Sequence, residues 1–179
     1  KPADTWEGIK EDVTLLNKEN NSLERFEVAG IAMGRADNIS RGVDIFYLFI
    51  LQHGVKFYNE NISEAIFAGQ QGPAGSSVYP GVEALELFTS FADPNQKHYS
   101  WNEFIVDDDA LEKEVEAFAH GKVSMIVGFG YTYEDIVNQI SLLKAKGLDT
   151  MDESDIRIAP IPQLLDPEVS KDKRVTYSN

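Results

Sequence analysis

The sequence predicts an α/β protein: a three-layer α/β/α sandwich in which helices cover both faces of a mostly parallel central sheet. Short apolar stretches that end in glycine or proline alternate along the chain with helix-forming stretches of ten or more residues. Strands and helices that alternate in this way form parallel sheets, because each connection between parallel strands needs a long crossover. The length of 179 residues and the hydrophobic share of 42% suit one well-buried domain better than two. We therefore expect a single α/β domain over residues 1–179.

The helices are predicted from apolar periodicity and from residues that can cap their ends. Residues 4–20 place Trp6, Ile9, Val13 and Leu16 on one stripe, which is typical of an amphipathic helix. Residues 41–53 are apolar almost all round, so this helix should be largely buried. Similar patterns predict three further helices, over 80–92, 101–120 and 133–146.

The strands are predicted where apolar, partly β-branched runs are short. They are expected at 26–34, 123–127 and 156–161, with a further strand beginning at 174–179 and a hairpin over 55–69. In parallel sheets, ligands bind beyond the carboxyl ends of the strands. This rule selects three loops as candidates for a binding site, "GRADNIS", "GFGYTY" and "PIPQ".

Composition excludes several classes of function. The chain has no cysteine, which rules out disulfides and thiolate chemistry, and its three histidines are too scattered to predict a metal site. The formal net charge of −14 argues against nucleic acid or an anionic membrane as a partner, because both need a basic surface. The first residues carry no apolar signal-peptide core, so we expect any targeting segment to be absent or removed. No cofactor is expected.

Enzyme motifs are absent from the sequence. It contains no nucleophile elbow, no phosphate loop of the P-loop type and no HExxH, and "GFG" is too short for a dinucleotide fingerprint. Asp107, Asp108 and Asp109 are consecutive, so they cannot all face one site on a helix or a strand. We interpret them as a solvated charge run at the start of a helix, where the helix dipole favours negative charge.

The candidate ligand-binding residues are aromatic or polar side chains near the predicted strand ends. Tyr131 and Tyr133 follow the central strand beside two glycines, and their rings suit stacking on a sugar or planar group; packing beneath the next helix explains them about equally well. Arg35, Asp37 and Asn38 can offer donors and acceptors to a hydroxylated ligand, or Arg35 can pair with Asp37 while Asn38 caps a helix. Trp101 is a further candidate, although packing at a helix start explains it better.

Six stretches of the chain form a more specific pattern. In order they are "TWEGIKEDVTLL", "IAMGRADNISRGVDIFYLFILQHG", "GVEALELFTSFADP", "YSWNEF", "AFAHGKVSMIVGFGYTY" and "IAPIPQ". In this order they resemble the second, C-terminal lobe of extracellular (periplasmic) solute-binding proteins of the sugar-binding type, which serve ABC importers. The most specific match is to the signature F-x-x-G-K-x-A-M followed by an aromatic residue, in which Ser124 stands where alanine is usual. The resemblance covers essentially the whole chain.

The resemblance implies one lobe of a type II periplasmic-binding-protein fold, in which two lobes close on a ligand held between them. It implies three partners: a carbohydrate, the membrane permease of the importer, and a first lobe that this sequence lacks. It also implies an extracellular or periplasmic location, with a lipoprotein anchor in the full-length parent. By position, Tyr131 and Tyr133 match the aromatic site of the family, and residues 34–38 match a loop that faces the cleft. The identity of the sugar does not carry over.

Two other classes of function stay open. A carbohydrate-processing enzyme needs two carboxylates about 5–9.5 Å apart in a cleft, whereas the predicted strand-end loops supply only Asp37. A non-catalytic interaction module would present a broad exposed apolar patch in place of a cleft. We therefore expect a binding protein and not an enzyme.

Overall fold

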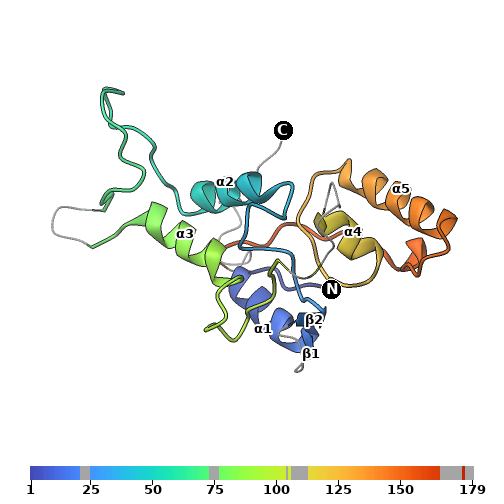
Figure 1. Ribbon diagram of the computed structural model, residues 1–179. Helices are drawn as coiled ribbons and strands as arrows, with labels where there is room; N and C mark the ends of the chain where they lie inside the picture. The colour runs from blue at the N-terminus through green and yellow to red at the C-terminus, as the bar shows by residue number, and fades with distance from the viewer. Residues whose placement is uncertain (21–24, 73–76, 104, 106–112, 166–174, 176–179) are drawn as a thin grey trace.

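The computed structural model describes residues 1–20, 25–72, 77–103, 105, 113–165 and 175, and these form a mixed α/β structure (Figure 1). The described residues contain one two-stranded antiparallel sheet, β1 (Lys18–Asn20) with β2 (Arg25–Val28). The helices are α1 (Trp6–Leu16), α2 (Gly42–Gln52), α3 (Pro80–Ser90), α4 (Lys113–Ala119), α5 (Thr132–Ala145) and a 3₁₀ turn η1 (Glu153–Asp155). No helix in these ranges has both the length and the apolar character needed to cross a membrane.

Helix α1 begins at Thr5, whose Oγ1 accepts a hydrogen bond from the Gly8 amide and so satisfies one of the free donors at the helix start. The predicted apolar stripe is buried at Trp6, Ile9 and Val13. The Trp6 ring packs 4.6 Å from the Phe49 ring, centroid to centroid, and its indole N–H donates to Gln52 Oε1 at 2.7 Å. These contacts join α1 to α2.

Helices α2 and α3 pack against each other (Figure 1). Their buried aromatic residues Phe49 and Phe88 belong to the main core. Phe49 is fully buried, and its ring lies 6.3 Å from that of Phe88 on α3. The prediction that α2 is largely buried is correct for one face only, since Val43 is 60% exposed and Tyr47 and Leu51 also lie at the surface. A second apolar cluster joins α4 to α5 through Val115, Ala119, Ile136, Ile140 and Leu143.

The predicted strands 26–34 and 123–127 run side by side in parallel, but they form a single bridge, between Ala29 and Val123. The Ala29 amide donates to the Lys122 carbonyl at 2.8 Å, and the Ala32 amide donates to the Met125 carbonyl at 3.0 Å. A regular ladder does not develop beyond Ala29, because a side chain accepts from the Ile31 amide, which is the next donor on that edge. The Gly30 and Ile31 amides donate to Asn17 Oδ1 and Ser100 Oγ, at 2.7 and 2.9 Å.

The prediction of a strand at 156–161 is wrong, because these residues follow η1 without regular pairing. Ile158 is 83% exposed, and the Arg157 guanidinium donates to the nearby carbonyls of Ser154 and Ile156. Parallel pairing is found two residues further on, where the Gln163 amide donates to the Asp4 carbonyl and Gln163 forms a bridge with Thr5. The segment packs against the main core from Ile161 to Leu164.

The predicted hairpin over 55–69 is confirmed by an antiparallel bridge between Tyr58 and Ala65. The Asn59 amide donates to the Glu64 carbonyl at 3.1 Å, which closes the turn. In Figure 1 this segment extends away from the helices. The predicted acidic helix start at 107–109 and all but residue 175 of the strand predicted at 174–179 lie outside the described residues.

Candidate ligand-binding site at the start of α2

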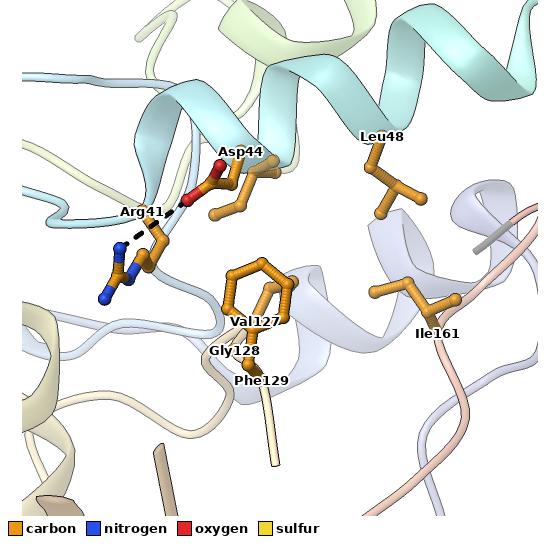
Figure 2. Close-up of a pocket in the computed structure, with 8 residues that line it drawn as sticks. Arg41, Asp44, Leu48, Val127, Gly128, Phe129 and Ile161 are labelled. Carbon is orange, nitrogen blue, oxygen red and sulfur yellow. Dashed lines mark ion pairs between the residues drawn. The ribbon is translucent and has the colours of Figure 1, made fainter. Parts of the chain in front are cut away.

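A small pocket of about 80 Å³ lies between the first turns of α2 and the segment that follows Val123 (Figure 2). Its walls are mostly apolar and its rim is charged, with lining residues Arg41, Asp44, Ile45, Leu48, Val127, Gly128, Phe129 and Ile161. A complete site for a small organic ligand has a volume of roughly 300–1,000 Å³. The pocket can therefore hold part of a ligand, and the rest of that ligand would lie outside it.

An aromatic pair stands beside this pocket. The rings of Phe129 and Tyr131 are stacked at 24° with their centroids 5.6 Å apart. The amide of Phe129 donates to Thr132 Oγ1 at 3.1 Å, and this bond fixes the turn into α5. Gly128 is needed at this turn, because a Cβ there would lie 2.6 Å from the same Thr132 oxygen. The loop therefore presents the two rings in one arrangement.

The Arg41 guanidinium lies over both rings. Its central carbon is 5.4 Å from the Tyr131 ring centroid and 6.0 Å from that of Phe129, within the range of a cation–π interaction. The same guanidinium forms a loose ion pair with Asp44, with 3.8 Å between nitrogen and oxygen (Figure 2). The side chains of Arg41 and Asp44 are 40% and 30% exposed, so both are accessible to a ligand.

Buried polar contacts hold the loop that leads into α2. The Asn38 side chain, only 4% exposed, donates to the Asn102 carbonyl at 2.8 Å and accepts from the Trp101 indole N–H at 2.8 Å. Two residues later, the Ser40 amide donates to Glu114 at 3.0 Å, and the Ser40 hydroxyl bonds to the same carboxylate. Glu114 is 3% exposed and belongs to α4. These bonds fix the position from which Arg41 projects.

Of the six residues that the sequence suggested, the structure brings Tyr131 to this site, with its side chain 41% exposed. Tyr133 lies on α5, where its hydroxyl donates to Glu153 at 3.0 Å, and this hydrogen bond raises the pKa of the phenol above its usual value. Trp101 has no exposed surface, and Asn38 is its buried hydrogen-bond partner. We therefore leave Tyr133, Trp101 and Asn38 out of the site described here.

Arg35 and Asp37 pair with each other, as the alternative interpretation of the sequence predicted. The guanidinium contacts Asp37 at 2.7 Å and Glu103 at 2.5 Å. The other half of that alternative, Asn38 as a helix cap, is wrong: the N-cap residue of α2 is Arg41. The reason is that the buried indole of Trp101 occupies the Asn38 side-chain oxygen.

The sequence interpretation missed Arg41, Asp44 and Phe129. Phe129 lies in the candidate loop "GFGYTY", from which only the two tyrosines are singled out by sequence; an aromatic residue between two glycines after a predicted strand is the signal for it. Arg41 and Asp44 are one turn apart at the start of α2, so they lie on one side of the helix, but that spacing does not indicate which segment lies opposite them.

In the described part of the chain, no group of three or more histidine or acidic residues is placed to hold a metal ion.

The Arg35–Asp37 pair should give a measurable pH dependence. The hydrogen bond from Arg35 lowers the pKa of Asp37 from 3.8 to about 2. Because the folded-state pKa is the lower one, the pair stabilises the fold above about pH 4 and loses this contribution as the pH falls towards 2. A ¹³C NMR titration of the Asp37 carboxyl should show a midpoint near the lower value. A midpoint near 4 would show that the pair is absent in solution.

Asp37→Asn should lower the free energy of unfolding by only about 0–1 kcal/mol, because the pair is largely exposed.

Comparison of the chain with known protein families, with curated proteins and with solved structures finds no match.

Proposed function

We propose that this chain is the carbohydrate-binding second lobe of a solute-binding protein that serves an ABC importer. The observation that carries the proposal is the stacked Phe129–Tyr131 pair with Arg41 above it, in which Tyr131 is exposed and Phe129 partly buried. The pair lies beside a pocket large enough for only part of a ligand. Aromatic faces stack on the apolar faces of sugar rings, while charged side chains bond to sugar hydroxyls. The order of the six sequence stretches supports the same class.

The proposed fold is a three-layer α/β/α sandwich of the type II periplasmic-binding-protein kind. The parallel hydrogen bonds of Ala29 and Ala32 to the 122–125 segment support it, as does the parallel bridge between Thr5 and Gln163. The site also fits this fold, since Phe129 and Tyr131 follow the segment that runs parallel to residues 29–32. This is the carboxyl end of the proposed strand, where ligands bind in parallel sheets.

The mechanism follows from the half-formed site. One face of the sugar would stack against the aromatic pair, and the first lobe would close over the other face. Closure excludes water, which strengthens the hydrogen bonds of Arg41 and Asp44 to the ligand. In this proposal the closed protein delivers the sugar to the membrane permease of the importer, and the parent protein is extracellular or periplasmic and anchored as a lipoprotein.

A carbohydrate-processing enzyme is a weaker candidate. Among the residues that line the pocket, Asp44 is the single carboxylate. Hydrolysis of a glycoside by the usual mechanisms needs two, separated by about 5–9.5 Å. We therefore propose binding without catalysis.

The proposal is tested by isothermal titration calorimetry with a panel of mono- and oligosaccharides. We expect a member of the panel to bind the full-length, two-lobe protein with micromolar affinity and to bind the isolated chain too weakly to measure, because half of the contacts are missing. A panel that gives no heat with the full-length protein would overturn the proposed function. Micromolar binding to the isolated chain would instead contradict the division of the site between two lobes.

A further inference from the structure

We infer that Arg41 and Asp44 act together as a donor and acceptor pair that selects an uncharged sugar over an acidic one. The inference rests on the proposed function and names the class of ligand that the same site takes. Its starting point is the arrangement of these two side chains at the rim of the pocket, side by side on the first turn of α2 (Figure 2).

The distance between the two charged groups is the first argument. At 3.8 Å, the Arg41–Asp44 pair is longer than a charge-assisted hydrogen bond, which is typically about 2.7–2.9 Å. The Arg35–Asp37 pair in the same structure is closed at 2.7 Å, so its groups are already hydrogen-bonded to each other. The looser pair at the pocket keeps a donor and an acceptor open to a third group.

The chemistry of a sugar hydroxyl is the second argument. A hydroxyl both donates and accepts, so neighbouring hydroxyls can accept from a guanidinium and donate to a carboxylate at once. A guanidinium has five donors and no acceptor, and an ionised carboxylate has acceptors only. Arg41 and Asp44 can therefore bond to adjacent hydroxyls on one ring, with one hydroxyl accepting from Arg41 and the other donating to Asp44.

The charges around the pocket are the third argument. An acidic sugar could pair with Arg41, but its carboxylate would then lie near the Asp44 carboxylate, since the two side chains are in contact. Like charges at such a distance disfavour binding, the more so where water is excluded. The formal net charge of −14 adds a general repulsion for anions. An uncharged ligand meets neither penalty.

The position of Arg41 over the aromatic pair is the fourth argument. The guanidinium lies 5.4 Å from the Tyr131 ring centroid, so the ring face already stabilises the positive charge of Arg41. A cation held in this way stays beside the stacked sugar and points its N–H groups to the ring hydroxyls. The Ser40–Glu114 bonds, which fix the loop before Arg41, hold the residue in that position.

The test uses pairs of sugars that differ only at C6, where one member has a hydroxymethyl group and the other a carboxylate. Glucose is compared with glucuronate and galactose with galacturonate, together with disaccharides of each pair, by calorimetry on the full-length protein. The uncharged member of a pair should bind at least about tenfold more tightly, a difference of about 1.4 kcal/mol. In Asp44→Asn the ratio should fall towards one, because the repelling carboxylate is gone. The matched control is Asp155→Asn in η1, which changes the net charge equally but lies outside the pocket residues.

Each outcome decides the inference. Preferred or equal binding of the acidic sugar by the unmodified protein would overturn the selectivity and leave the proposed function standing. Equal effects of Asp44→Asn and Asp155→Asn would show that total charge, and not the Arg41–Asp44 pair, sets the preference. If no uncharged or acidic sugar binds the full-length protein, the proposed function fails and the inference fails with it.

Discussion

Replacement of Trp101 by alanine should lower the free energy of unfolding by about 3–5 kcal/mol, the usual cost of removing a large buried aromatic side chain. Trp101 has no exposed surface and belongs to the main apolar core. The substitution leaves a cavity and also removes the indole donor of the buried Asn38 oxygen. An acceptor that is buried without a partner costs a further ~1–3 kcal/mol. Urea unfolding followed by circular dichroism measures the loss.

Two controls separate packing from ligand contact at Trp101. Trp101→Phe fills most of the cavity but still lacks the donor to Asn38, so its loss should be intermediate. Leu165→Ala, at a residue 61% exposed, should change stability by no more than about 0.5 kcal/mol. If Trp101→Ala unfolds as the unmodified protein does but no longer binds a sugar, Trp101 belongs to the binding site and the packing assignment is wrong.

The helices were predictable because their signal is local. The predictions of 41–53, 80–92 and 133–146 correspond to helices observed at Gly42–Gln52, Pro80–Ser90 and Thr132–Ala145. Two predictions are too long: the end of 4–20 forms β1, and of 101–120 the described residues are helical only over Lys113–Ala119. Apolar spacing and end signals lie within each segment, so they need no knowledge of the rest of the chain.

The single parallel bridge between Ala29 and Val123, in place of a regular ladder, was not predictable, because it depends on contacts far apart in sequence. The Gly30 and Ile31 amides are taken by Asn17 and Ser100, which lie 13 and 69 residues away along the chain. The apolar pattern of 26–34 says only that the segment is buried. It does not say whether a strand or a side chain will accept from its amides.

The candidate site, like the fold, was predictable only where its signal is local in the sequence. The local pattern predicts Tyr131 as a candidate ligand contact, and the structure places it in the aromatic pair beside the pocket, although residues 123–127 form no regular strand. Trp101 could not be separated from a ligand-stacking residue, because its partner Asn38 is 63 residues away. Arg41 and Asp44 enter the site only because α2 lies against residues 127–129, and neither segment alone indicates that contact.

Replacement of Tyr131 by alanine in the full-length protein should weaken sugar binding about 5- to 150-fold, because one aromatic stacking contact contributes roughly 1–3 kcal/mol. The ring is 41% exposed, so its removal should leave the melting temperature nearly unchanged. It also supports the Arg41 guanidinium through a cation–π contact, so Arg41 loses part of its orientation in this variant. Calorimetric titration with the sugar that binds the unmodified protein most tightly gives the change.

Two further variants test whether the loss of affinity comes from the ring of Tyr131. Tyr131→Phe keeps the ring face and should keep most of the affinity, since stacking needs no hydroxyl. Tyr79→Ala removes a tyrosine that is 42% exposed at the start of α3, outside the pocket, and should leave the affinity unchanged. Unchanged affinity in Tyr131→Ala would mean that the ring only packs on Phe129. In that case the Phe129–Tyr131 pair would stabilise the turn into α5, and the sugar would bind elsewhere.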